Sequence, residues 1–120
     1  MTTPMEITAH QISDIIDGSK PFLVFFKSEF CDYCKALEPF LAVLYSRYHR
    51  ELGIYTLDVD DENSAASVFD DYIKGVPSVI LFYKGQFVPL KDPEHPDLFL
   101  WYRPSYIEDF VKTFLRSANA

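Results

Sequence analysis

The sequence predicts an α/β domain in which a mixed β-sheet lies between layers of helices. Three observations support this prediction: helix-like and strand-like patterns alternate from residue 7 to residue 75, a hairpin pattern follows, and an amphipathic helix closes the chain. The 120 residues, 48% of them hydrophobic, fit one domain spanning residues 1–120 that can bury an ordinary core.

The first helix is expected to begin at Thr8. Thr8 and Gln11 have the spacing of a capping box, and Ile7 with Ile12 has that of a hydrophobic staple. The core-facing residues of this helix are expected to be Ile12, Ile15 and Ile16. Residues 22–26 are apolar without alternation, which indicates a central strand that is covered on both faces.

A second helix is expected to open at Lys35, to kink near Pro39 and to end before Gly53. Its inward residues, at helical spacing, are Leu37, Phe40, Leu41, Leu44, Tyr45 and Tyr48. A strand follows at residues 54–59, and Ser64 is expected to cap a short helix after it. This short helix is expected to carry Val68, Phe69, Tyr72 and Ile73, and to close at Gly75.

The last third of the chain has a different pattern. Residues 78–83 predict a strand, 84–85 a turn, and 86–90 the hairpin partner, while residues 98–102 are expected to extend or edge the sheet. A second capping box, Ser105 to Glu108, is expected to open the final helix. The inward residues of that helix are Ile107, Phe110, Val111, Phe114 and Leu115.

The charge and the hydropathy pattern exclude several classes of function. A formal net charge of -7 argues against a nucleic-acid binder, because neutralising phosphates requires a patch of lysine and arginine. The N-terminus has no basic region leading into an apolar stretch, and every apolar run is far shorter than the roughly 20 residues that span a bilayer. We therefore expect a cytoplasmic protein that binds neither nucleic acid nor a membrane.

Cys31 and Cys34 are the only cysteines, and they form Cys31-Asp32-Tyr33-Cys34 between the central strand and the second helix. In the cytoplasm, where thiols are kept reduced, such a pair is more often catalytic or metal-binding than structural. Unpaired amides and the helix dipole at a helix N-terminus favour a thiolate at Cys31, whereas Cys34 lies one turn further in. We therefore expect Cys31 to be the nucleophile that forms a mixed disulfide and Cys34 to be the resolving thiol.

Two charged neighbours are expected to modulate the nucleophile. Asp32 raises the energy of a thiolate at Cys31, whereas Lys35 and Lys27 lower it, each by about 0.3–1 kcal/mol. If Asp32 dominates, the disulfide form is relatively favoured and the protein is a reductant rather than an oxidant.

An ordered set of motifs accompanies the cysteine pair: Lys35, Pro39, Asp60, Gly75-Val76-Pro77 and Tyr83-Lys84-Gly85. With this set the chain resembles the thioredoxin family over nearly its whole length. The resemblance implies a thioredoxin fold, with a central mixed sheet of four to five strands flanked by helices on both faces. It also implies thiol–disulfide exchange with protein disulfide substrates and a recycling reductase, and a cis bond before Pro77. We expect a monomer without a cofactor or bound metal.

The resemblance also assigns a substrate-binding surface beside the dithiol. Its expected residues are Phe30, Tyr33, Val76 and Pro77. The backbone at Val76 is expected to pair with an extended substrate segment, and the other three to form an apolar rim around Cys31. Trp101 or Tyr102 is expected either to extend this rim or to pack in the core, and packing is the expectation for Trp101 above all. Ordinary packing is also the alternative role for Phe30 and Tyr33.

The chain departs from the thioredoxin pattern at the residues that handle protons. Phe25 stands where the family usually has an aspartate, and Thr56 where a lysine is usual, so no proton carrier for Cys34 is evident. Glu29 is a candidate substitute, although a solvated carboxylate is the more common state of such a residue.

Two other functions stay open at this point. Tyr33 and Phe26-Lys27-Ser28 are closer to glutaredoxins, which use glutathione or bridge an iron–sulfur cluster. The missing proton carriers instead favour a binding module with an idle dithiol. A zinc site is disfavoured because His10, His49 and His95 lack ligand spacing, and the acidic run at residues 58–62 does not match a calcium loop.

Overall fold

The structure is a computed structural model that describes residues 4–15, 20–71, 73, 75–91 and 102–118. Within these residues, five strands form one sheet in the order β1-β3-β2-β4-β5. Their bounds are β1 Met5–Glu6, β2 Phe22–Lys27, β3 Gly53–Asp58, β4 Ser78–Tyr83 and β5 Gln86–Pro89. The pairs β1–β3 and β2–β3 are parallel, and β2–β4 and β4–β5 are antiparallel, so the predicted mixed sheet is confirmed.

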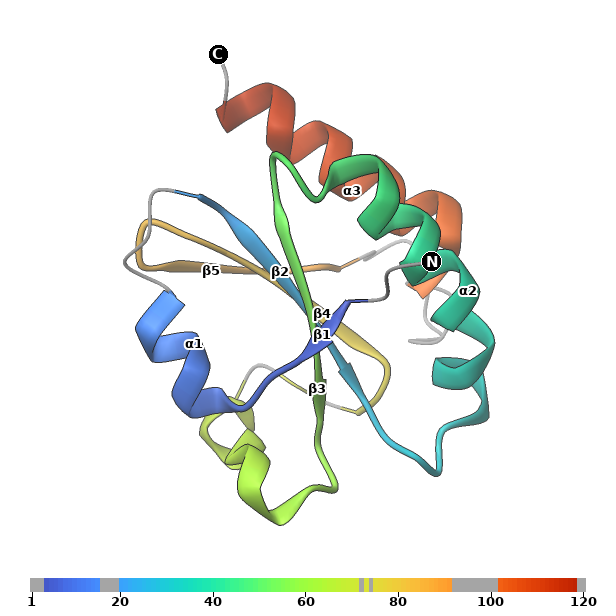
Figure 1. Ribbon diagram of the computed structural model, residues 1–120, viewed down its shortest axis with the longest axis vertical. Helices are drawn as coiled ribbons and strands as arrows, with labels where there is room; N and C mark the ends of the chain where they lie inside the picture. The colour runs from blue at the N-terminus through green and yellow to red at the C-terminus, as the bar shows by residue number, and fades with distance from the viewer. Residues whose placement is uncertain (1–3, 16–19, 72, 74, 92–101, 119–120) are drawn as a thin grey trace.

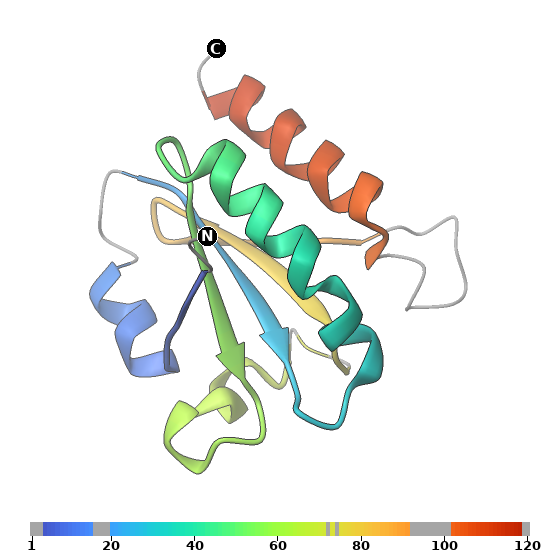
Figure 2. The same ribbon diagram turned by 45° about the vertical axis from the view of Figure 1, so that its right-hand side comes forward.

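Helices cover both faces of the sheet (Figure 1). Helices α2 (Asp32–Tyr48) and α3 (Pro104–Ala118) lie side by side on one face, as Figure 2 shows from a second direction. Helix α1 (Ala9–Ile15) and two 3-10 helices, η1 (Glu62–Ser64) and η2 (Ala66–Phe69), cover the other. No helix in the described part of the chain is long and apolar enough to cross a bilayer.

Strand β2 is the centre of the core, as the apolar run predicted. Its residues Phe22 to Phe26 are all buried, and they alternate between the two faces of the sheet. Leu23 and Phe25 pack with α2 and α3, whereas Phe22, Val24 and Phe26 pack with α1 and η2. Burial on both faces explains why the sequence lacks the polar alternation of a half-exposed strand.

The N-terminal capping box is confirmed. The Thr8 amide donates to Gln11 Oε1 at 2.9 Å, and the Gln11 amide donates to Thr8 Oγ1 at 3.4 Å. Ile7 and Ile12 are both buried in one apolar cluster, as a hydrophobic staple requires. The expected core positions of the Ile15 side chain and of Ile16 lie outside the described residues.

Helix α2 begins at Asp32, three residues before the expected start at Lys35, and it continues through Pro39. Cys31 is its N-cap, so both cysteines belong to the start of the helix. Of the predicted inward residues, Leu37, Leu41 and Leu44 are buried, and Phe40, Tyr45 and Tyr48 are partly buried against the same cluster.

The short helix predicted after β3 is wrong in type and in its cap. Two 3-10 helices replace it, separated by Ala65 in the left-handed conformation at φ 55°. Asp61, not Ser64, caps the first of them by accepting from the Asn63 amide at 3.0 Å. The second ends at Phe69 rather than at Gly75; Phe69 is buried and Val68 is exposed, while Tyr72 lies outside the described residues.

The hairpin between β4 and β5 is confirmed, with β5 ending one residue before the prediction. Lys84 and Gly85 both have positive φ, 51° and 76°, which is the conformation of a tight two-residue hairpin turn. The strand expected at residues 98–102 falls, except for Tyr102, outside the described residues.

The second capping box is wrong. Helix α3 begins at Pro104, whose lack of an amide suits the first helical position, so Ser105 already lies inside the first turn. The Glu108 carboxylate instead accepts from Arg47 Nη1 at 2.9 Å and from the Tyr48 hydroxyl at 2.8 Å. These contacts join α3 to α2. The expected inward residues Ile107, Val111 and Leu115 are buried.

The contact between Glu108 and α2 predicts an acid-sensitive contribution to stability. The hydrogen bond from Tyr48 is the largest cause that lowers the pKa of Glu108 below its usual 4.5. Burial opposes it, and Arg47 and Lys112 add to the lowering. A lowered pKa in the folded state stabilises the fold above the unfolded-state pKa, and this stabilisation is lost as the pH falls through the folded-state pKa. In urea unfolding at a series of pH values, Glu108→Gln should therefore be less stable than the parent near neutrality, with a difference that shrinks on acidification.

The control is Asp109→Asn, which removes the exposed carboxylate next along α3. A Glu108→Gln difference that stays constant, or grows, on acidification would contradict the assignment.

Candidate active site

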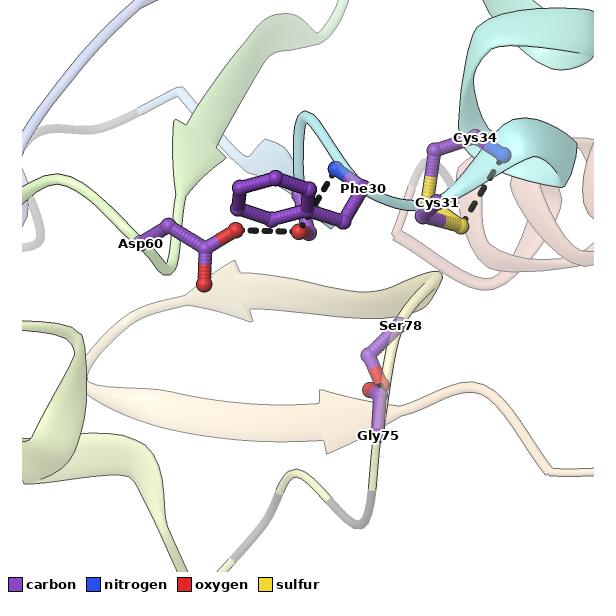
Figure 3. The surroundings of a disulfide bond; sticks show 7 residues. Phe30, Cys31, Cys34, Asp60, Gly75 and Ser78 are labelled. Carbon is purple, nitrogen blue, oxygen red and sulfur yellow. Dashed lines mark hydrogen bonds between the residues drawn. A yellow bond between two sulfur atoms is a disulfide. The ribbon is translucent and has the colours of Figure 1, made fainter.

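Cys31 and Cys34 are joined by a disulfide at the start of α2, with their Cα atoms 5.2 Å apart (Figure 3). The Cys34 amide donates to Cys31 Sγ at 3.1 Å, and the Lys35 amide donates to the Cys31 carbonyl at 3.2 Å. The first turn of α2 thus directs an N–H group at the sulfur of Cys31. In the reduced protein such a donor favours the thiolate over the thiol.

The two sulfurs differ in exposure. Cys31 is half-buried, whereas Cys34 is 2% exposed and belongs to the apolar cluster under α2. Burial among apolar side chains disfavours the charged form of a thiol. The arrangement therefore gives one accessible sulfur that a helix amide favours as an anion, and one enclosed sulfur within reach of it.

Ser28 anchors the loop that carries Cys31. Its buried hydroxyl donates to Asp60 Oδ2 and accepts from the Phe30 amide at 3.1 Å, while its carbonyl accepts from the Cys31 amide at 3.1 Å. Figure 3 shows the two hydrogen bonds of the hydroxyl. Sequence reasoning missed Ser28 as an anchor. A serine hydroxyl often accepts from the backbone amide two residues later in a turn, so the hydrogen bond from Phe30 could have been predicted, but the one to Asp60 could not.

Tyr33 is tied to the segment that precedes α3. Its hydroxyl donates to the Tyr102 carbonyl at 3.0 Å. The Tyr102 side chain is buried, which raises its pKa above 10.0, whereas Ser78 acts in the opposite direction on this pKa. Ser78 Oγ in turn donates to the Gly75 carbonyl at 2.6 Å. Tyr102 therefore joins the cysteine motif to the segment before α3.

A shallow hollow of about 450 Å³ lies beside Cys31. It is lined by Ser28, Phe30, Cys31, Asp32, Tyr33 and Val76. Three of the four residues predicted to bind substrate thus line one surface with the first cysteine. The fourth, Pro77, is buried and does not line it, and the Val76–Pro77 bond is cis, as the resemblance implied. Phe30 is 86% exposed.

Phe25 and Thr56, at the two positions where the chain departs from the family pattern, carry no ionisable side chain. Phe25 and Thr56 are paired across β2 and β3, and both are buried. The buried polar side chains in the described ranges are Ser28, Thr56, Ser64 and Ser78, none of which is a carboxylate or an amine. Glu29, Asp32 and Lys35 are exposed, and no group of three side chains suited to a metal ion occurs among the described residues. Trp101 lies outside them.

Comparisons with known proteins give one consistent family. Residues 4–96 match the family model described as Thioredoxin. The chain is 34% identical over 83 residues to the bifunctional thioredoxin reductase/thioredoxin of Mycobacterium leprae, an alignment that covers 68% of this chain and 18% of that protein. It is 29% identical to the thioredoxin of Acidithiobacillus ferridurans, covering 66% of this chain and 71% of the other. The chain thus spans less than a fifth of the first relative.

Solved structures of thioredoxins share the fold. The thioredoxin of Malassezia sympodialis superimposes with a TM-score of 0.72 at 18% identity, covering 95% of this chain and 91% of that one. Mitochondrial thioredoxin 3 of Saccharomyces cerevisiae, in its oxidised form, gives 0.71 at 18% identity, covering 92% and 94%. At this identity the likeness establishes the predicted fold and nothing finer.

The anchoring role of Ser28 predicts a loss of stability. Ser28→Ala leaves the Phe30 amide and the Asp60 carboxylate without their shared partner, which should lower the free energy of unfolding by about 1–3 kcal/mol. Asp60→Asn keeps an acceptor oxygen and should cost less. Denaturant unfolding of both variants checks this, and a Ser28→Ala protein as stable as the parent would remove Ser28 as an anchor.

The unequal exposure of the two sulfurs predicts unequal alkylation after reduction. Cys31 should react with iodoacetamide with a midpoint below about pH 8.5, the value of a free cysteine, whereas Cys34 should stay unmodified in the folded protein. Peptide mass spectrometry after timed alkylation across a pH series measures both rates. Equal rates, or a Cys31 midpoint at the free-cysteine value, would contradict the assignment.

Proposed function

The chain belongs to the thioredoxin family, and we propose from this that it is a thiol–disulfide oxidoreductase that reduces protein disulfides through Cys31 and Cys34. One observation carries the proposal: a half-exposed sulfur that caps α2 accepts a helix amide and is bonded to a second, buried sulfur. Members of this family act on protein disulfides. The family and the cysteine pair together support the same chemistry for this chain.

The proposed reaction assigns a separate role to each sulfur. The Cys31 thiolate attacks one sulfur of the substrate disulfide, forms a mixed disulfide, and releases the other sulfur as a thiolate that takes up a proton. Cys34, once deprotonated, attacks Cys31 Sγ and releases the second substrate thiol. Two electrons pass from the dithiol to the substrate, and the pair ends as the Cys31–Cys34 disulfide.

A dithiol reductant must then return the pair to the reduced form. Thioredoxins are recycled by thioredoxin reductase, and one relative carries both names in a single protein. A reductase of this class is therefore the proposed recycling partner. We propose that the protein acts as a reductant and that it acts in the cytoplasm. Asp32 is proposed to oppose the Cys31 thiolate and Lys35 to favour it, because both charged side chains are exposed within the first turn of α2.

The hollow beside Cys31 is the proposed seat of the substrate. The Val76 backbone would pair with an extended segment that carries the substrate cysteine, and Phe30 and Tyr33 would contact its apolar side chains. Phe30 is suited to this role because an aromatic ring so exposed has little packing of its own to lose. Pro77 would act from beneath, by holding the turn that presents Val76.

Mixed-disulfide trapping tests the proposal. Cys34→Ser removes the resolving thiol, so covalent complexes through Cys31 should accumulate in cells and disappear on reduction. In an insulin-type assay with a chemical dithiol as reductant, the parent should reduce disulfides at least about tenfold faster than Cys31→Ser. The double variant Cys31→Ser/Cys34→Ser is the matched control for non-covalent binding. An empty trap, together with Cys31→Ser activity equal to the parent, would favour a binding module with an idle dithiol.

A further inference from the structure

We propose that the hollow beside Cys31 selects disulfide substrates whose reacting cysteine is flanked by lysine or arginine. The inference rests on the proposed function, because the same dithiol carries out the exchange. The inference specifies the charge of the substrate segment, whereas the apolar residues of the hollow specify only that the segment has apolar side chains. Charge distinguishes between substrates because Asp32 lines the hollow, while Glu29 and Asp60 are exposed next to residues that line it.

The apolar part of the surface makes it a place where a partner docks. Phe30 is 86% exposed although it is a large aromatic residue, and it lines the hollow together with Tyr33 and Val76. Aromatic residues, phenylalanine among them, are enriched at protein interfaces relative to the rest of the surface. Cys31 lines the same hollow, so a partner that docks on Phe30 lies next to the reacting residue.

The charged part of the surface is negative. Asp32 lines the hollow and is exposed, and Glu29 is exposed in the loop next to Phe30. Asp60, also exposed, is brought to this loop by its hydrogen bond from Ser28, which itself lines the hollow. The three carboxylates come from the loop after β2, the first turn of α2 and the segment after β3.

Positive charge in the same stretch is smaller. Lys27, at the end of β2, is paired with Glu6 at 2.9 Å, and its charge is thereby largely compensated. Lys35 is exposed one turn into α2. Among Glu29, Asp32, Lys35 and Asp60 the sum of the charges is negative, on a chain whose own net charge is -7.

Such a surface attracts a cationic segment and repels an anionic one. Fixed charges at the mouth of a hollow raise the local concentration of an oppositely charged partner, and the effect weakens beyond about 10 Å at 0.1 M salt. The Ser28 hydrogen bond adds to the selectivity because it holds the Asp60 carboxylate in place before the substrate arrives. Oxidised glutathione, which has carboxylates at both ends of each half, is by the same reasoning a poor substrate.

A set of three matched peptides tests the inference. Each contains one cysteine as a disulfide to uncharged 2-thiopyridine, and the flanking residues are lysine, serine or glutamate. The reduced protein attacks the cysteine sulfur through Cys31 and releases 2-thiopyridone, which absorbs; Cys34 then frees the peptide thiol, so that one disulfide breaks and one forms. Each rate is divided by the rate of the same peptide with dithiothreitol, which cancels differences in intrinsic reactivity.

At low ionic strength the parent should react at least about threefold faster with the lysine peptide than with the glutamate peptide, and this ratio should fall toward one at about 1 M salt, where the screening length is near 3 Å. The double variant Glu29→Gln/Asp32→Asn should lower the ratio at low salt. Removing Asp32 also affects the Cys31 thiolate, but that effect changes all three peptide rates by the same factor and leaves the ratio unchanged. Asp109→Asn on α3, outside the hollow, should keep the parent ratio.

The outcomes separate the two proposals. Equal normalised rates for the lysine and glutamate peptides, with the serine peptide also reduced, overturn the charge selection and leave the proposed function intact. A ratio that is unchanged in the double variant overturns the assignment to Glu29 and Asp32. Failure to reduce any of the three peptides overturns the proposed function, and the selection with it.

Discussion

Burial of Phe22 to Phe26 in β2 is the constraint on which the rest of the structure depends. The strand is hydrogen-bonded to β3 on one side and to β4 on the other, and its side chains fill the cores on both faces. Its position and direction are therefore fixed by the whole sheet. Because only residues 28–31 separate β2 from α2, the strand also fixes where Cys31 meets the first amides of that helix. The packing of β2 therefore fixes the position in which Cys31 Sγ accepts the helix amide that favours its thiolate.

Two tethers give this short connection its shape, and neither involves sulfur. Ser28 binds Asp60 after β3, and Tyr33 binds Tyr102 before α3. Each joins the cysteine motif to a residue far away in the sequence, so three separate segments hold the hollow. Neither hydrogen bond uses a sulfur atom, so neither support depends directly on the disulfide.

Local sequence patterns predicted the elements whose structure depends on residues close together in the chain. The unbroken apolar run from Phe22 to Phe26 identified the central strand, and the motif placed both cysteines at the start of α2. The two capping boxes illustrate the limit: Thr8 and Gln11 bind each other, whereas Glu108 binds Arg47 and Tyr48 of α2 instead. Ser28 was missed as an anchor for the same reason, since its partner lies 32 positions along the chain.

The apolar surroundings of Cys34 have a consequence for the order of steps in the proposed reaction. Phe25 lies in the cluster that encloses Cys34. Thr56, which is paired with Phe25 across the sheet, is buried and has no ionisable group that could accept a proton from Cys34. A thiol in such a place loses its proton less readily than one that caps a helix. Attack by Cys31 is therefore the easier step and resolution by Cys34 the harder one, which lengthens the life of the mixed disulfide. A long-lived mixed disulfide makes recognition beside Cys31 more important, because every partner captured wrongly occupies the dithiol until Cys34 releases it.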